Sequence, residues 1–167
     1  MTCLNNVYLL LGGNLDDREA MLRKAKEEVS LRIGPVQQES YIYESEPWGF
    51  ETDQRFLNQV VQVVSPLKPN EILDEILDIE NGLGRARDNA KGYKSRSIDI
   101  DILFYNDEII REGDLTIPHP RIAERMFTLV PLAQMDRDFI HPGCRKTIGE
   151  LVAECQDPLS VYFYLES

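Results

Sequence analysis

Two aspartates separated by one residue form the most chemically specific pattern in the chain. Asp99 and Asp101 occupy alternate positions of an otherwise apolar run, so a β-strand would place both carboxylates on one face, roughly 6.5–7 Å apart at their Cα atoms. The apolar residues would share the opposite face: Ile98, Ile100, Ile102 and Phe104. Like charges this close repel each other unless a cation lies between them. Because Mg²⁺ prefers carboxylate, water and phosphate oxygens, the pattern predicts a metal site at Asp99 and Asp101.

A cluster of basic residues precedes the aspartates. Five of the 18 Lys and Arg residues fall in the segment from Arg85 to Arg96, although the chain has a net charge of −11. Guanidinium and ammonium groups bind phosphate oxygens, so the two patterns together predict a site for a metal-bound polyphosphate. From these residues alone two plainer interpretations stay open: a solvated face of an edge strand for the aspartates, and a solvated charged loop for the basic segment.

The composition is that of one soluble domain. The 167 residues suffice for a single core, so residues 1–167 are expected to form one domain, and 43% hydrophobic with 28% charged residues is ordinary for a soluble protein. The acidic balance disfavours nucleic acid and anionic membranes as partners. Three widely spaced cysteines indicate reduced thiols, and no apolar run reaches the length of a membrane span. We therefore expect a cytoplasmic protein. We also expect a monomer whose partners are small molecules, although composition does not determine the oligomeric state.

Apolar periodicity and turn residues predict the elements that position these groups. Strands are expected at residues 7–11, 36–43, 56–64, 96–104, 108–110 and 161–165, and helices at residues 17–33, 69–82, 126–134 and 147–154. The order βαββαβ, with a hairpin and further C-terminal elements appended, predicts an α+β fold. It is a ferredoxin-like two-layer sandwich with helices on one face of a largely antiparallel sheet. Asp99 and Asp101 must then lie on the open face, where a ligand can bind.

Residues 96–103, Arg-Ser-Ile-Asp-Ile-Asp-Ile-Leu, are similar to the signature of the 6-hydroxymethyl-7,8-dihydropterin pyrophosphokinases. Four further segments resemble the family in order and approximate spacing: residues 12–15, 56–58, 84–87, and 115–120 leading to 125–127. The resemblance covers nearly the whole chain. It implies transfer of a diphosphoryl group from ATP to the hydroxymethyl oxygen of a reduced pterin in folate biosynthesis, with release of AMP and with two Mg²⁺ ions between Asp99, Asp101 and the triphosphate.

The resemblance also implies roles for individual residues. The catalytic set would be Arg85, Arg96, Asp99 and Asp101. ATP would be bound by Arg85, Lys91, Arg96, Ile102, Thr116 and His119. The chain departs from the family pattern at Tyr93, Ser95, Asp114 and Pro120, positions that concern loop and rim contacts rather than the metal centre.

A pterin is a flat bicycle, so its site needs aromatic faces and a hydrogen-bonding rim. Phe56 and Phe127 can supply the faces. Asn58 follows Phe56 by two residues and shares its strand face, where the carboxamide can pair with the ring edge. Backbone groups near Ser45 and Trp48 can complete the rim. Plainer roles stay open from sequence alone: core packing for both phenylalanines, a backbone cap for Asn58 and a surface turn for His119.

Two other functions fit the same residues less well. One is a Mg²⁺-dependent kinase that acts on a different small alcohol and releases ADP rather than AMP. The other is a non-enzymatic ferredoxin-like module that binds a ligand or RNA, since this fold hosts many functions. RNA binding would favour exposed aromatic residues, rather than aspartates, on the central strands. Residues 12–14, Gly-Gly-Asn, lack the lysine of a phosphate-binding loop and are interpreted as a plain turn.

Overall fold

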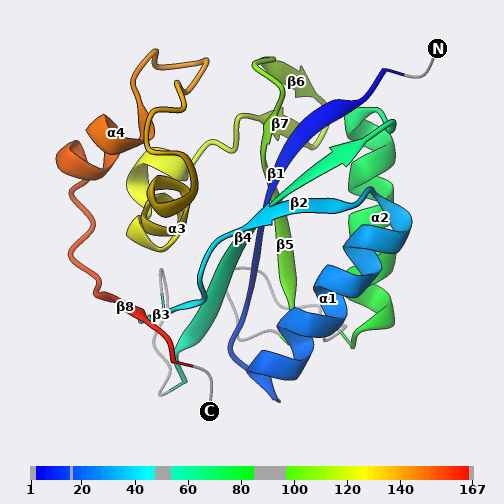
Figure 1. The fold of residues 1–167 in the computed structure, drawn as a ribbon, viewed down its shortest axis with the longest axis horizontal. Helices are drawn as coiled ribbons and strands as arrows, with labels where there is room; N and C mark the ends of the chain where they lie inside the picture. Colours follow the sequence, from blue (N-terminus) through cyan, green and yellow to red (C-terminus); the bar gives the residue numbers. More distant parts are fainter. Residues whose placement is uncertain (1–2, 16, 48–53, 85–96, 166–167) are drawn as a thin grey trace.

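The computed structural model describes residues 3–15, 17–47, 54–84 and 97–165 (Figure 1). Its strands are β1 (Asn5–Gly13), β2 (Val36–Glu39), β3 (Tyr43–Ser45), β4 (Phe56–Ser65), β5 (Asp99–Tyr105), β6 (Ile110–Glu112), β7 (Leu115–Ile117) and β8 (Val161–Phe163). Its helices are α1 (Arg18–Arg32), α2 (Pro69–Gly82), α3 (Met126–Asp136) and α4 (Ile148–Glu154), with a short 3₁₀ helix at Ile122–Glu124. Within the described part, no helix is long and apolar enough to cross a membrane.

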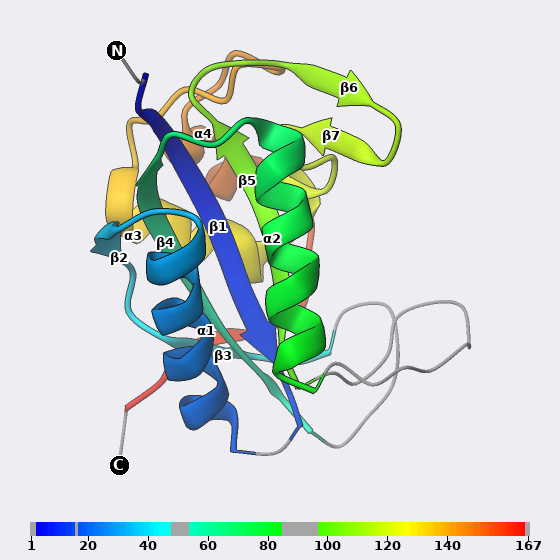
Figure 2. The same cartoon turned by 90° about the vertical axis from the view of Figure 1, so that its right-hand side faces the viewer.

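The main sheet is antiparallel, with strand order β5-β1-β4-β3-β8 and with β2 also paired to β4. Helices α1 and α2 cover one face of this sheet (Figure 2). Helices α3 and α4 pack against part of the other face (Figure 1). The mixed helix and strand content and the antiparallel sheet were predicted correctly. The expectation of helices on one face holds for α1 and α2 only.

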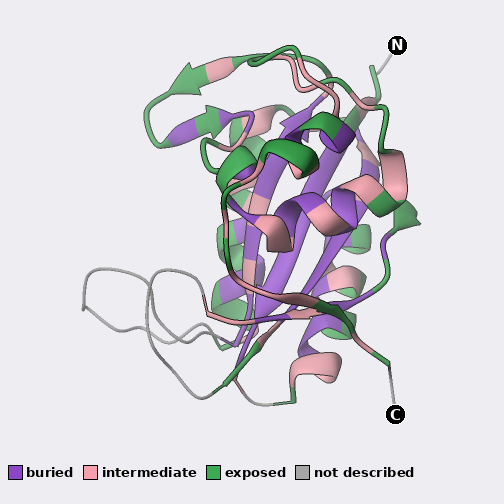
Figure 3. Ribbon diagram, turned by 90° about the vertical axis from the view of Figure 1, so that its left-hand side faces the viewer, coloured by how far each residue is buried: buried purple, intermediate pink, exposed green. Residues whose placement is uncertain are grey.

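Two apolar clusters hold the layers together, and the central strands between them are buried (Figure 3). The first lies between the sheet and helices α1 and α2, and includes Leu9, Leu11 and Ile76. The second lies between the sheet and helices α3 and α4, and includes Leu10 and Leu129. Successive residues of β1 point to opposite faces, so a single strand contributes to both clusters.

A bulge in β5 changes which of its residues face which layer. Tyr8 pairs with Phe104 and Leu9 pairs with Ile102, so Leu103 is an extra residue without a partner in the register. An inserted residue reverses the alternation of the strand beyond it. Ile102 therefore packs with the α1 and α2 cluster, whereas Phe104 packs with Tyr8 on the opposite face. The prediction that Phe104 shares a face with Ile102 was wrong for this reason.

Three other predicted strands differ in extent or partner. The strand expected at residues 36–43 is divided into β2 and β3 at Ser40. There the backbone N–H of Ser40 donates to the carbonyl oxygen of Val60 in β4, and Oγ of Ser40 accepts from the N–H of Val60, so a side-chain bond replaces part of the ladder. The strand expected at residues 108–110 is β6, which pairs with β7 in a separate sheet rather than with β5. The last strand, β8, ends at Phe163 instead of residue 165.

Local chemistry explains how α1 is bounded. Asp17 caps the helix by accepting a hydrogen bond from the backbone N–H of Ala20 at 3.2 Å. The helix is followed by Gly34, where a Cβ atom would lie 2.1 Å from the carbonyl oxygen of Val64. Only glycine permits the chain to pass this close to β4, so Gly34 fixes how α1 packs against the sheet.

Candidate functional site

The aspartate pair lies on β5, the edge strand of the main sheet. Asp99 and Asp101 are half-buried, and both line a cleft of about 410 Å³ formed by α2, β5 and the segment that follows β7. The cleft is lined by Leu73, Ile76, Leu77, Glu80, Asp99, Ile100, Asp101, His119, Pro120, Arg121 and Arg125. The structure therefore brings the two predicted metal-binding carboxylates and His119 together in one cleft.

The imidazole of His119 is held against the aspartates in its neutral form. Its Nδ1 accepts a hydrogen bond from the backbone N–H of Arg121 at 3.1 Å, so the proton of the neutral ring is on Nε2. This Nε2 lies 4.0 Å from Oδ2 of Asp101. Burial, and then the charge of Arg125, lower the pKa of His119 from 6.5 to about 4, against an opposing effect of Asp99. His119 can thus offer an uncharged N–H donor to a ligand beside Asp101.

The backbone of β5 is fixed from the side of α2 by Glu80. The Glu80 side chain is buried, and its Oε2 accepts a hydrogen bond from the backbone N–H of Ile100 at 2.9 Å. Ile100 lies between the two aspartates, so this bond fixes the strand at the point where both carboxylates leave it. Glu80 was not predicted from the sequence, although a carboxylate on the apolar stripe of a helix, four residues after Ile76, was a signal that could have identified it.

Arg125 supplies a buried positive charge to the same cleft. Its side chain is almost fully buried, and its guanidinium carbon lies 5.5 Å from the centre of the Phe127 ring. The segment 125–127 was noticed in the sequence only as part of a resemblance. A buried arginine beside two carboxylates indicates a place where a polyanion can be bound.

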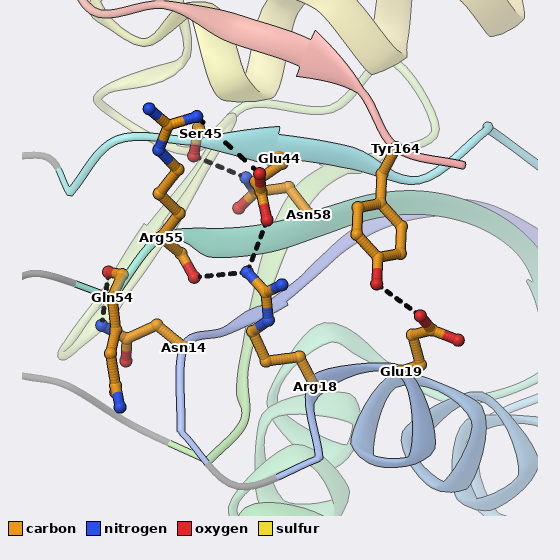
Figure 4. A network of polar contacts seen from close by, with 9 residues as sticks. All are labelled: Asn14, Arg18, Glu19, Glu44, Ser45, Gln54, Arg55, Asn58 and Tyr164. Atoms are coloured by element: carbon orange, nitrogen blue, oxygen red, sulfur yellow. Dashed lines mark hydrogen bonds and ion pairs between the residues drawn. The ribbon is translucent and has the colours of Figure 1, made fainter. Parts of the chain in front are cut away.

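A second group of predicted residues meets at the start of β4. The side-chain amide Nδ2 of Asn58 donates a hydrogen bond of 2.7 Å to Oγ of Ser45 (Figure 4), and both side chains are buried. Phe56 is half-buried and pairs with Ser45 in the register of β3 and β4. We call Ser45 and Asn58 the Ser45/Asn58 pair. Residues directly opposite in antiparallel strands share a face, so Ser45, Phe56 and Asn58 point to the same side of the sheet.

The two groups lie in one row across the sheet, on either side of β1. Gly12 of β1 pairs with Asn58 of β4 and with Asp99 of β5. Two interstrand spacings of about 4.7–4.9 Å place Asn58 and Asp99 roughly 10 Å apart at their Cα atoms, on the same face. Gly12 has no side chain, and a Cβ atom there would lie 3.0 Å from Oδ1 of Asn58. The glycine thus keeps the space between the two groups open.

The remaining predicted site residues are placed as follows. Ile102 is buried in the α1 and α2 cluster, and Thr116 is exposed on β7; neither is among the described residues that line the cleft. Phe127 is half-buried in the first turn of α3, where it packs with the second cluster beneath Arg125. Four predicted residues lie outside the described part of the chain: Trp48, Arg85, Lys91 and Arg96.

The donor set of the cleft suits a cation whose coordination a ligand completes. Within the described residues, no group of three or more His, Cys, Asp or Glu side chains is arranged to hold a metal ion. Mg²⁺, however, is usually bound by one or two carboxylates and completes its shell with water and substrate phosphates. Asp99 and Asp101, both facing the cleft, meet that requirement.

Comparison with known proteins gives a consistent result. A family model described as 7,8-dihydro-6-hydroxymethylpterin-pyrophosphokinase (HPPK) matches residues 8–137. The 2-amino-4-hydroxy-6-hydroxymethyldihydropteridine pyrophosphokinase of Aquifex aeolicus is 40% identical over 148 residues, which cover 89% of this chain and 91% of that protein. The protein of the same description from Bacillus subtilis is 42% identical over 137 residues, 79% of each chain.

Solved structures with a similar fold include the HPPK-DHPS protein of Plasmodium falciparum, in a triple-mutant form. The match has a TM-score of 0.72 at 20% sequence identity and covers 92% of this chain. The chain spans only 44% of that longer protein, so the likeness concerns the fold of one part of it.

Proposed function

Since the chain belongs to the 7,8-dihydro-6-hydroxymethylpterin-pyrophosphokinase family, we propose that its reaction takes place along the row Asp99, Gly12 and Asn58. The reaction is transfer of a diphosphoryl group from ATP to the hydroxymethyl group of the dihydropterin, in folate biosynthesis. The row carries the proposal, because it sets a carboxylate cleft suited to phosphates beside an amide pair suited to a ring edge, on one face of the sheet. Phosphoryl transfer depends mainly on such positioning and on charge neutralisation.

The triphosphate lies in the cleft, with its charge balanced from several sides. Asp99 and Asp101 would hold two Mg²⁺ ions, which supply charge neutralisation and activation of the attacking hydroxyl when bound. His119 donates a hydrogen bond from Nε2–H to a phosphate oxygen, and Arg125 contributes a buried positive charge. Further phosphate and nucleotide contacts come from the residues that the family resemblance assigns to ATP: Arg85, Lys91, Arg96, Ile102 and Thr116.

The pterin binds beside the Ser45/Asn58 pair. Ser45 accepts a hydrogen bond from one amide N–H of Asn58, which fixes the plane of the carboxamide and leaves its oxygen and second N–H for the edge of the ring. Phe56 and Phe127 face the two sides of the bicycle, and Trp48 completes the rim. In this arrangement the hydroxymethyl oxygen points across β1 toward Asp99 and the bound triphosphate, so the attacking and transferred groups approach each other over Gly12.

The wider organisation follows the same proposal. Residues 1–167 form a single domain, and the element order βαββαβ together with the strand neighbours β5-β1-β4-β2 supports a ferredoxin-like core to which α3, α4 and β8 are added. The free cysteines Cys3, Cys144 and Cys155 suit a reducing compartment such as the cytoplasm.

The direct test is to identify the products formed from ATP, Mg²⁺ and 6-hydroxymethyl-7,8-dihydropterin. We expect one AMP for each pterin diphosphate, measured by chromatography and phosphorus NMR. ADP together with a pterin monophosphate would contradict the proposal and favour a monophosphoryl kinase. A parallel reaction in EDTA measures how far turnover depends on the divalent cation.

A further inference from the structure

Arg18, the first residue of α1, links the two strands that carry the Ser45/Asn58 pair (Figure 4). Its Nη1 lies 2.7 Å from Oε2 of Glu44 and 2.9 Å from the carbonyl oxygen of Arg55. Glu44 precedes Ser45 in β3, and Arg55 comes directly before Phe56, the first residue of β4. One guanidinium group therefore holds β3 and the beginning of β4 at a fixed separation.

Within the described residues, strand β3 has short ladders on both sides, and besides Arg18 only the Arg55 side chain is seen to reach Glu44, with Nη1 at 3.8 Å from Oε1. The strand pairs with β4 through three residues, of which Tyr43 lies opposite Asn58 and Ser45 lies opposite Phe56, and its other neighbour β8 is equally short. Strands this short contribute few backbone hydrogen bonds and open easily on their own. Side-chain contacts to the rest of the fold then decide where Ser45 lies relative to Asn58.

The ion pair between Arg18 and Glu44 is shielded from solvent by the C-terminal segment. The ring of Tyr164 lies 5.7 Å from the Arg18 guanidinium carbon, and its hydroxyl bonds to Glu19. Only 26% of the Arg18 side chain and 23% of the Glu44 side chain are exposed, against 41% and 38% for the ion pair of Arg32 with Glu28 at the other end of α1. Less exposed charges are screened less by water and salt, so the attraction between Arg18 and Glu44 is stronger than that between Arg32 and Glu28.

The β1–α1 turn reinforces the same attachment. Its residue Asn14 is buried and donates a hydrogen bond of 3.3 Å from Nδ2 to the carbonyl oxygen of Gln54 (Figure 4). Asn14 and Arg18 together therefore hold two consecutive carbonyl groups, those of Gln54 and Arg55, immediately before β4. A turn interpreted from sequence as plain thus fixes the entry to the strand that carries Asn58.

We propose that Arg18 is a positioning residue for pterin binding. It acts through Glu44 and Arg55. These contacts keep β3 and β4 at the separation at which Ser45 accepts the hydrogen bond from the amide N–H of Asn58. The inference rests on the proposed location of the pterin at the Ser45/Asn58 pair. Loss of the guanidinium lets β3 shift, so the carboxamide of Asn58 is no longer held in the plane of the ring edge, while the cleft at Asp99 keeps its own support from Glu80.

The test compares Arg18→Met with Arg32→Met, which removes an exposed arginine from the same helix. For Arg18→Met we expect the KM of the dihydropterin to rise about fivefold or more, as one charge-assisted contact among several is lost, with kcat and the KM of ATP changed less than about twofold. Arg32→Met leaves all three constants unchanged. Glu44→Gln, which keeps the size and an acceptor oxygen but removes the charge, changes the pterin KM in the same direction, and it serves also if Arg18→Met does not fold.

The outcomes separate this inference from the proposed location of the pterin. An unchanged pterin KM in Arg18→Met, or an equal rise in the KM of ATP, overturns the positioning role. Asn58→Ala, assayed in parallel, tests the location itself. If Asn58→Ala raises the pterin KM and Arg18→Met does not, the pterin location stands and the role of Arg18 falls. If Asn58→Ala has no effect, the pterin location is wrong and the inference falls with it.

Discussion

The neutral state of His119 makes the stability of the metal-free protein depend on pH in a way that can be calculated. The pKa of His119 is lowered to about 4 in the folded chain, mainly by burial and by Arg125, whereas the unfolded chain has the ordinary value near 6.5. Between these values the unfolded state binds the proton more readily. The stabilising contribution is therefore complete above pH 6.5 and is lost as the pH falls toward 4. Linkage then gives a loss of about 2 kcal/mol in the free energy of unfolding between pH 7.5 and 5.

The assay is urea unfolding at pH 7.5 and 5 in EDTA, so that no cation competes with the proton, for the wild type and for His119→Gln. Carboxylates titrate in both proteins, so the difference between the two pH dependences isolates His119. We expect His119→Gln to lose about 2 kcal/mol less than the wild type on acidification. His141 is the only other histidine, so two imidazole signals in NMR suffice to assign the titration. A His119 pKa at or above 6.5, or equal losses for the two proteins, would refute the reasoning.

Substitutions at four residues test the row across the sheet and the neighbouring carboxylate of Asp101. Asp99→Ala or Asp101→Ala is expected to leave a folded protein by circular dichroism but to remove nearly all turnover, since lost charge neutralisation costs several kcal/mol in the transition state; a tenth of wild-type activity in either variant would contradict the carboxylate site. Asn58→Ala should weaken dihydropterin binding by about 1–3 kcal/mol in calorimetry with ATP affinity nearly unchanged, and a loss confined to ATP would place the pterin elsewhere. Gly12→Ala should weaken pterin binding because its Cβ would lie 3.0 Å from Oδ1 of Asn58, whereas Gly82→Ala, with open space around it, should not.

Alternation along the sequence was enough to place the aspartates but not to follow the whole strand. Asp99 and Asp101 share a face with each other because the strand is regular between them, and period-2 patterns report such regular stretches. The prediction placed Phe104 on the wrong face, because the bulge at Leu103 arises from pairing with β1. The local alternation of apolar and polar residues carries no information on that pairing. A predicted face therefore holds only up to the first irregularity of the register.

Glu80 shows a second limit, which concerns contacts between elements. On its own helix it is one more carboxylate of an acidic protein, and composition gives it no special role. Its function becomes visible only where α2 packs beside the edge strand and Glu80 meets the N–H of Ile100. Edge strands expose unpaired backbone donors, so a helix that covers such an edge needs an acceptor there. Glu80 therefore meets a structural requirement of the edge strand that carries Asp99 and Asp101.

The position of Gly12 suits the proposed arrangement, in which the two substrates bind at β4 and β5, on either side of β1, rather than on the same strand. Carboxylates for a metal-bound triphosphate need a rigid, partly solvated edge, which β5 provides. An amide pair for the pterin edge needs burial, which β3 and β4 provide in the interior of the sheet. The strand between them must then separate the two sites without filling the space over which the groups react. A side chain at residue 12 would meet Asn58, so the proposed arrangement of the substrates needs glycine at this position of β1 to leave the space between them open.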